Sequence, residues 1–299
     1  MGAKTQILLV TALLTGQPQA ADIVAAREHP AFWLWSGVKA SDELKDAQTV
    51  YLHQGEVLVR SGNVVFQRLG LPVSRLSFPS IWLTVRFTTL DVPEAIPARI
   101  IRLMQRWQAA GNHVVGLQVD FDAATHQLAD YARFLQQLRQ QLPAEFALGV
   151  TGLLDWAKTG DVATLNALAV DELVVQSYQG RHTVTNYQAY LPALSRLRIP
   201  FKLGLVQNGS RDPQAEAQLE KSPWYRGTVV FMLNPPRRYA FALWWQQPER
   251  LSMIGHSALS SPGQLSASAS KCKRMACSSL ICRSMSATFS KVRFFTSAL

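Results

Sequence analysis

Hydrophobic residues gather along the chain in eight short runs rich in β-branched and aromatic side chains, and each run predicts a strand. Segments whose apolar residues recur three and four positions apart separate most of these runs, and this spacing predicts amphipathic helices. The order of elements therefore predicts an α/β fold with a parallel sheet. The expected strands are Phe32–Ser36, Thr49–His53, Ile81–Phe87, Val114–Asp122, Phe146–Thr151, Glu172–Tyr178, Phe201–Val206 and Thr228–Leu233.

Two of the helical patterns are strong. Pro97–Ala110 repeats apolar residues at helical spacing and is followed by Gly111 as a stop signal. His126–Gln141 carries one apolar stripe, and Thr125 stands where a helix cap is expected. Weaker patterns predict helices over Val162–Leu168, Tyr187–Arg196 and Pro213–Leu219.

Eight strands with helices between them, over about 200 residues, predict a (β/α)8 TIM-type barrel. The first third is expected to be irregular, because Glu56–Arg60 and Val64–Arg68 flank Ser61-Gly62-Asn63 as a β-hairpin where a helix should stand. The alternative is a doubly wound sheet, which needs fewer strands and usually has a glycine-rich phosphate loop. The chain has neither G-x-G-x-x-G nor G-x-x-x-x-G-K.

The two ends of the chain differ from the body. Met1–Lys4 is basic, Ile7–Leu14 is apolar, and small residues follow up to position 21, which predicts a signal peptide over 1–21 and a periplasmic or secreted protein. A first buried strand or helix is the alternative. No internal apolar run is long enough to cross a bilayer. We assign 31–256 to the barrel domain and 257–299 to a disordered, serine-rich, basic tail. An out-of-frame reading of the end of the gene would also explain the composition of this tail.

The net charge of +10 does not indicate a nucleic-acid partner, because much of it comes from the tail. Six basic residues and no acidic one follow His256, so the preceding chain has 24 basic and 20 acidic residues. All three cysteines also lie in the tail, at spacings that match no common zinc pattern. We therefore expect neither a metal nor a cofactor.

The sequence of residues 116–122, GLQVDFD, alternates apolar and polar residues along one expected strand. In a barrel one face of a strand packs on the helices and the other points inward. Asp120 and Asp122 would then share the inner face near the strand end, where two like charges raise the pKa of one carboxyl. An acid protonated near neutrality is what glycoside hydrolysis requires. The alternative is that Asp120 and Asp122 simply form a solvated strand end before a turn. Val115, Leu117, Val119 and Phe121 are expected to face the helices, and Gly116, Gln118, Asp120 and Asp122 the interior.

Polar and aromatic residues stand at other strand ends as well. Each has a plainer explanation, as core filler, helix cap or loop residue, but together they suit a sugar site, where rings stack on the sugar and amides or carboxylates bond its hydroxyls. A metal site from Asp120, Asp122 and His126 is disfavoured because His126 begins a helix. The expected substrate-binding residues are Gln118, Tyr178, Gln176, Asp155, Arg86, Trp35, Gln207 and Asn234.

The segments GLQVDFDAAT, GVTGLLDWA, VDELVVQSYQGR and FKLGLVQNG resemble an uncharacterised family of secreted bacterial proteins, a domain of unknown function. The resemblance covers residues 31–235. The fourth strand is more distantly similar to the D-G-x-D-x-D-x-E motif of chitinase-type glycoside hydrolases. There Asp122 falls on the acid, Asp120 on the group that positions an acetamido substituent, and Gln118 on the second Asp.

Gln176 and Tyr178 fall on the M-x-Y motif of the same hydrolases, whose Tyr contacts the acetamido group. The chain departs from the pattern, since Gln118 replaces an Asp and Asp122 is one methylene shorter than Glu. A shortfall of about 1 Å can cost two orders of magnitude in rate.

We therefore expect an exported, glycoside-hydrolase-like barrel that acts on a polysaccharide or cell-envelope glycan. Asp122 would serve as general acid/base and Asp120 as its electrostatic partner. Two alternatives stay open: a non-catalytic carbohydrate-binding barrel and a structural envelope protein without a glycan ligand.

Overall fold

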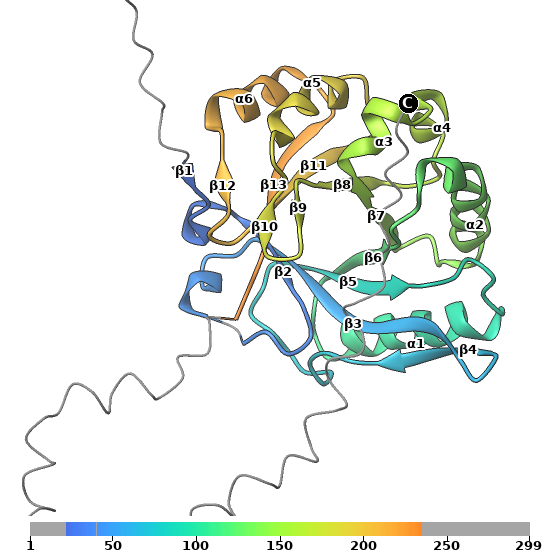
Figure 1. Ribbon diagram of the computed structural model, residues 1–299. Helices are drawn as coiled ribbons and strands as arrows, with labels where there is room; N and C mark the ends of the chain where they lie inside the picture. The colour runs from blue at the N-terminus through green and yellow to red at the C-terminus, as the bar shows by residue number, and fades with distance from the viewer. Residues whose placement is uncertain (1–21, 40, 235–299) are drawn as a thin grey trace, which may run out of the picture. The chain divides into compact units, whose positions relative to one another are not determined.

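Eight parallel strands form a closed barrel in the computed structural model, which describes residues 22–39 and 41–234. The barrel closes because β2 pairs with β3 on one side and with β13 on the other. Each of the eight predicted strands is present, so the prediction of a (β/α)8 barrel is confirmed (Figure 1). The strands are β2 (Ala31–Leu34), β3 (Thr49–Arg60), β5 (Ser80–Phe87), β6 (Val114–Asp120), β7 (Ala147–Leu153), β8 (Glu172–Gln176), β11 (Phe201–Val206) and β13 (Tyr225–Phe231).

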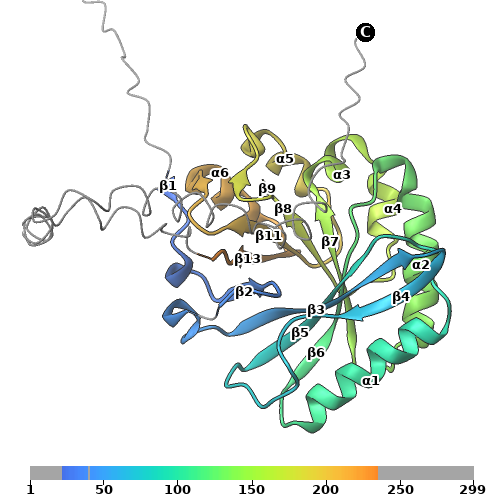
Figure 2. The ribbon, with the colours of Figure 1, turned by 60° about the horizontal axis from the view of Figure 1, so that its bottom comes forward.

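Helices lie around the outside of these strands (Figure 2). The two longest are the ones with the strongest sequence patterns, and their apolar stripes are buried against the barrel. In the part of the chain that the structure describes, no helix is long and apolar enough to span a membrane. The helices are α1 (Ala95–Ala109), α2 (Leu128–Gln141), α3 (Leu154–Thr159), α4 (Val162–Asn166), α5 (Leu191–Leu194) and α6 (Pro213–Ala217).

The first third of the barrel is irregular, as predicted. A 3-10 turn, η2 (Asp42–Leu44), stands between β2 and β3 where a helix is usual. The expected hairpin is formed by β3 and β4 (Asn63–Arg68), joined by Ser61 and Gly62 with φ of 49° and 77°. Two residues with positive φ make the turn that suits the twist of a hairpin.

Four two-residue strands and four further 3-10 turns complete the described elements. The strands β1 (Asp22–Ile23) and β12 (Ser210–Arg211) pair with each other, as do β9 (Tyr178–Gln179) and β10 (His182–Thr183). None of the four was predicted, because two-residue strands leave no periodicity in the sequence. The turns are η1 (Ala26–Glu28), η3 (Thr125–Gln127), η4 (Tyr187–Ala189) and η5 (Gln218–Lys221).

The predicted ends of the chain lie outside the described residues. This applies to the signal peptide over 1–21, to the tail over 257–299 and to the last part of the expected barrel domain, after residue 234. The domain boundaries therefore stay predictions.

The barrel interior is filled by aromatic rings. Trp33 and Trp82 belong to an inner hydrophobic cluster that is separate from the larger core between strands and helices. The rings fit because glycines face them. A Cβ on Gly116 would lie 2.9 Å from the Trp82 ring, and one on Gly204 would lie 2.9 Å from the Trp33 ring. Large side chains on some strands thus pack against glycines on other strands, as dense packing requires.

A β-bulge changes the expected alternation at the start of β6. Ile81 pairs with Val114 and Trp82 with Gly116, so Val115 is an extra residue in the strand. Val115 packs against the inner cluster, whereas Leu117 belongs to the outer core. The prediction that Val115 faces the helices is therefore wrong, because a bulge moves one side chain to the other face.

A buried polar network closes the end of the barrel where the strands begin. The Tyr51 hydroxyl donates to Glu172, and Lys202 Nζ lies 2.9 Å from Glu172 Oε2 and donates to Tyr51 Oη at 2.9 Å. Burial, and next the charge of Glu172, raise the pKa of Tyr51. The interior of the barrel is therefore packed and charge-balanced at this end.

The close approach at Gly116 gives a test of the packing. We expect Gly116→Ala to lower the free energy of unfolding by about 3 kcal/mol, because its Cβ would meet the carbonyl oxygen of Ala147 at 2.1 Å. Gly62→Ala is the control. It lies in open space with positive φ and should cost only about 1 kcal/mol. Urea unfolding measures the free energy of unfolding of both variants. A smaller loss for Gly116→Ala than for Gly62→Ala would contradict the packing described.

Candidate active site

One guanidinium bridges the two aspartates at the carboxyl ends of β5 and β6. Nη2 of Arg86 lies 3.0 Å from Oδ2 of Asp122, and its Nη1 lies 3.6 Å from Oδ2 of Asp120. Arg86 and Asp120 are direct neighbours in the register of the two strands. The side chains of Asp120 and Asp122 are 5% and 50% exposed, so only Asp122 is open to a ligand.

Asp120 holds its proton more tightly than an ordinary aspartate. Burial raises the pKa of Asp120 to about 6, Arg86 opposes this rise, and the charge of Asp122 adds to it. The Thr151 hydroxyl donates to Oδ1 of Asp120 at 2.7 Å and fixes the carboxyl. One raised pKa was expected in the pair, and Asp120 has it. Its main cause is burial, however, rather than the charge of Asp122.

Gln118 lies one step deeper on the inner face of β6 and is fully buried. Its Oε1 accepts hydrogen bonds from Trp33 Nε1 at 2.6 Å and from Thr84 Oγ1 at 3.0 Å. Its Nε2 has no partner within the described residues. Gln118 therefore forms the floor of the site and orients the Trp33 indole, while its role as a ligand contact stays a prediction.

An aromatic wall stands beside the carboxylates. Trp35 stacks on His53 with ring centroids 3.8 Å apart, and Phe231 contacts both Trp35 and Tyr178, at 5.9 Å and 5.3 Å. Burial, and next the charges of Asp120 and Asp122, raise the pKa of Tyr178. Trp35, which follows β2, thus forms one group of partly exposed rings with Tyr178 of β9 and Phe231 of β13.

His53 is a neutral member of this wall. Its Nδ1 lies 2.9 Å from Ser36 Oγ, and burial, followed by the charge of Arg86, lowers the pKa of His53 to about 4. At neutral pH the imidazole therefore adds no positive charge, and Arg86 is left to balance the carboxylates.

The side chains of Gln207 and Asn234 form hydrogen bonds with the loop between β2 and β3. Gln207 Nε2 donates to Glu43 Oε2 at 2.7 Å, and its Oε1 accepts from the Leu233 amide at 2.9 Å. Asn234 Oδ1 accepts from the Lys39 amide at 3.1 Å, and its Nδ2 donates to the Gly37 carbonyl at 2.8 Å. Both side chains clamp the rim loop, and contact with a ligand stays a prediction for each.

The structure shows no contact between Asp155 or Gln176 and the charged cluster of Arg86 and the two aspartates. Asp155 is exposed in the first turn of α3, and Gln176 is the half-buried last residue of β8. Neither side chain makes a hydrogen bond or ion pair with another residue that the structure describes. The structure therefore joins Arg86, Asp120 and Asp122 directly, while it shows no contact between these three and either Asp155 or Gln176.

Thr151, His53 and Phe231 were not among the predicted site residues. Thr151 could have been found, since it is a polar residue on a strand next to Asp120. His53 and Phe231 gave no signal beyond lying near strand ends. Within residues 22–39 and 41–234, no three His, Cys, Asp or Glu side chains lie close enough together to hold a metal ion.

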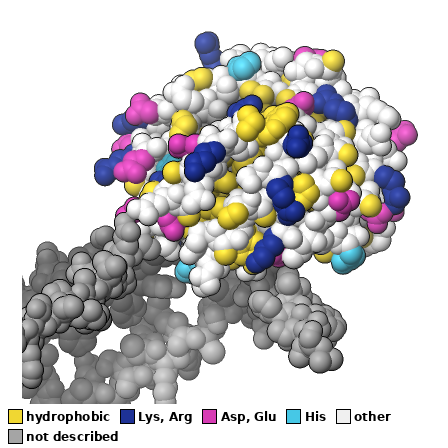
Figure 3. Space-filling view, turned by 90° about the horizontal axis from the view of Figure 1, so that it is seen from above, with side chains coloured by type: hydrophobic (Ala, Val, Ile, Leu, Met, Phe, Trp, Pro, Cys, Tyr) yellow, Lys and Arg dark blue, Asp and Glu magenta, His cyan; other side chains and the backbone are white. Residues whose placement is uncertain are grey.

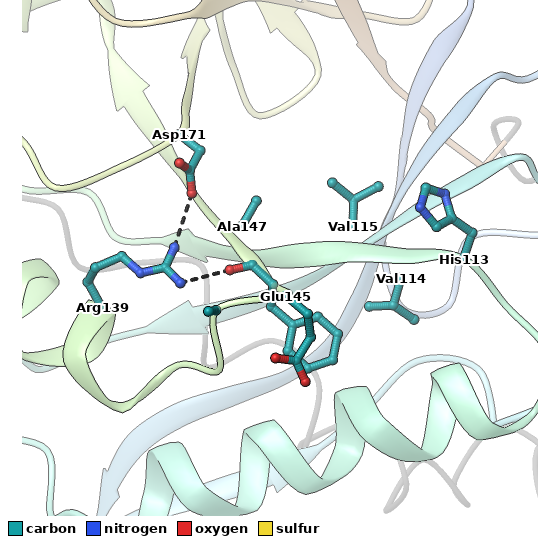
Figure 4. A pocket seen from close by; sticks show the side chains of 9 residues that line it. His113, Val114, Val115, Arg139, Glu145, Ala147 and Asp171 are labelled. Carbon is teal, nitrogen blue, oxygen red and sulfur yellow. Dashed lines mark hydrogen bonds and ion pairs between the residues drawn. The ribbon is translucent and has the colours of Figure 1, made fainter.

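Other surface features lie apart from this cluster. A hollow of about 620 Å³ opens at the strand-start end of the barrel, where Arg139 donates to Asp171 at 3.1 Å and to the Phe146 carbonyl at 2.8 Å (Figure 4). None of the predicted site residues lines it. The face seen in Figure 3 carries a band of apolar side chains bordered by Lys and Arg. Apolar atoms cover more than half of an ordinary protein surface, so this band alone marks no site.

Residues 75–220 match a protein family described as a domain of unknown function, DUF3142. The predicted resemblance to a domain of unknown function is thus confirmed. The DUF3142 segment contains Arg86, Asp120 and Asp122, whereas Trp35 and Asn234 lie outside it. No curated protein matches the chain.

Several solved structures are similar to the chain at low identity. The xylanase and alpha-amylase inhibitor protein XAIP-II from Scadoxus multiflorus is 13% identical, with a TM-score of 0.44, over 68% of this chain and 92% of that one. The Bacillus cereus spore cortex-lytic enzyme SleL is 14% identical, with a TM-score of 0.38, over 59% and 49%. The CBM22-1–GH10 modules of Clostridium thermocellum xylanase Xyn10B are 12% identical, with a TM-score of 0.38, over 72% and 62%. With TM-scores below 0.5, these similarities tell nothing about what this chain binds.

The buried carboxyl of Asp120 predicts a pH dependence of stability. Asp120 titrates near pH 6 when folded and near pH 4 when unfolded, so between these values the folded chain holds the extra proton. Rising pH therefore lowers the free energy of unfolding, and this loss is complete above pH 6. Relative to Asp120→Asn, we expect the wild type to lose about 2 kcal/mol between pH 4 and pH 7.

Urea unfolding of both proteins across this range measures the difference. The titration of His53 occurs in both and cancels. Asp130→Asn, which changes an exposed carboxylate on α2 and leaves Asp120 in place, is the matched control and should keep the pH dependence of the wild type. A difference between wild type and Asp120→Asn that stays constant with pH would show that Asp120 is not held protonated.

Proposed function

We propose that this protein is a glycoside-hydrolase-like barrel that acts on a polysaccharide or cell-envelope glycan through Asp122 and Asp120. The cluster of Arg86 with the two aspartates carries the proposal, because it lies at the carboxyl ends of the strands. Catalytic groups of (β/α)8 enzymes occupy that end.

In this proposal the two carboxylates have different tasks, set by their surroundings. Asp122 is half exposed and meets the glycan, exchanging a proton with the glycosidic oxygen as general acid/base. Asp120 is buried and acts through the guanidinium that both share. When Asp120 is protonated, Arg86 pairs with Asp122 alone. When Asp120 is ionised, Arg86 is divided between two anions.

The aromatic wall supports a sugar ligand. Trp35, Tyr178 and Phe231 offer partly exposed ring faces next to the carboxylates, and an apolar wall with few polar groups is usual for a ligand site. Sugars combine apolar ring faces with hydroxyls, which matches this mixture. The predicted signal peptide makes an extracellular or envelope glycan the expected substrate.

A non-catalytic carbohydrate-binding barrel is the second candidate. The ion pair between Arg86 and Asp122 favours it, because a carboxylate held at 3.0 Å by a guanidinium is engaged before any substrate arrives. The same residues would then grip a glycan without cleaving it. A structural envelope protein without glycan ligand is the third.

Asp122→Asn distinguishes these functions. We expect hydrolysis of the preferred polysaccharide to fall by at least about 100-fold, because loss of a general acid/base costs that much, while glycan binding is retained. Reducing-sugar release and binding to immobilised glycans measure the two. Asp130→Asn, exposed on α2, is the control and should leave both unchanged.

Unaltered hydrolysis in Asp122→Asn would remove Asp122 from the active site. Binding without hydrolysis in the wild type would establish the binding barrel. If the wild type neither hydrolyses nor binds any member of a broad glycan panel, the structural envelope protein is the candidate that remains.

A further inference from the structure

The outer side of the barrel around β4 and α1 is rich in arginine. Residues 57–90 and 95–119 contain seven arginines and no Asp or Glu. Apart from Arg86, none of the seven forms an ion pair with a carboxylate among the described residues. The six are Arg60, Arg68, Arg75, Arg99, Arg102 and Arg106.

Two of these arginines face one hollow. The helix α1 lies beside β4 (Figures 1 and 2), and Arg99 lies over the Phe66 ring of that strand. Beyond the end of β4 a hollow of about 400 Å³ is lined by residues 68–73 and by Arg106 from the last turn of α1. Arg68 and Arg106 thus reach the same space from two different elements.

The walls of this hollow are fixed by buried contacts. Gln54 is fully buried, and its Oε1 accepts from Arg68 Nη2 at 3.4 Å and from Trp107 Nε1 at 2.8 Å. Its Nε2 donates to the Leu71 carbonyl at 3.2 Å. Gly70 has φ of 77°, and a Cβ there would lie 2.0 Å from the His53 carbonyl oxygen. The loop therefore needs glycine at position 70 and a polar side chain at position 54.

The two guanidiniums repel each other. Burial, and next the charge of Arg106, lower the pKa of the Arg68 guanidinium. The position of Arg106 in the last turn of α1 suits the helix dipole, but that does not explain why Arg68 lies beside it. Like charges held together on a fixed wall are stabilised when an anion lies between them.

We propose that the hollow between Arg68 and Arg106 binds an oxyanion of the phosphate type. A guanidinium presents N–H donors in a planar fork that matches phosphate oxygens, and two of them that line one hollow can hold one phosphoryl group. The site lies on the outside of the barrel, so it is independent of the function proposed for Asp120 and Asp122.

Titration with inorganic phosphate at constant pH and ionic strength, followed by calorimetry, tests the site. We expect saturable binding of one phosphate per chain, weakened at least about tenfold in Arg68→Gln and in Arg106→Gln. Arg60→Gln is the matched control. Arg60 is exposed on the same hairpin, bonds Gln67 and does not line the hollow, so its loss should leave binding unchanged.

Stability gives a second readout that a purely structural arginine would not produce. In low salt without phosphate, Arg106→Gln should raise the melting temperature, because it removes the repulsion. Phosphate should raise the melting temperature of the wild type and not that of the variant. A lower melting temperature of Arg106→Gln, together with no effect of phosphate on the wild type, would overturn the proposal.

The source of the phosphoryl group is tested with vesicles. Binding to phosphatidylglycerol vesicles but not to phosphatidylcholine vesicles, lost in Arg106→Gln, would identify a lipid headgroup. Binding of inorganic phosphate without vesicle binding would identify a soluble phosphoryl group. Equal behaviour of wild type and all three variants in both experiments would refute an anion site in this hollow.

Discussion

The positive charge of Arg86 is what allows two aspartates to stand close together at the mouth of this barrel. Asp120 is almost fully buried, and an unbalanced carboxylate in such a place costs several kcal/mol. No other cation forms an ion pair with Asp120 or Asp122 among the described residues, and His53 is neutral above about pH 4. Burial and Arg86 act on Asp120 in opposite directions, and their balance sets the protonation of the pair.

The packing below the mouth holds this arrangement in place. Trp33 crosses the interior towards Gln118, and its ring fits only because Gly204 faces it. Gln118 accepts from Trp33 and from Thr84, which fixes β6 just before Asp120. Thr151 then fixes the carboxyl itself. The site is thus supported from the core upward, by residues that a ligand on the surface would not touch.

The sequence predicts the strands and the hairpin because their signals are local. The alternation in GLQVDFD places Gln118, Asp120 and Asp122 correctly at the inner face and the strand end. It misplaces Val115, because the bulge depends on how β5 and β6 align, which one strand's sequence does not contain. The roles of Gln207 and Asn234 as clamps depend likewise on a loop some 190 residues away in the chain from Asn234.

The pKa of the Asp120 carboxyl, measured by NMR in the wild type and in Arg86→Met, tests the central claim most directly. Methionine keeps an unbranched stem and removes the charge. The wild-type value should be about 6, and the variant's value should be clearly higher, because the guanidinium lowers it. Equal pKa values in two folded proteins would mean that Arg86 does not balance the aspartates, and the site described here would lose its basis.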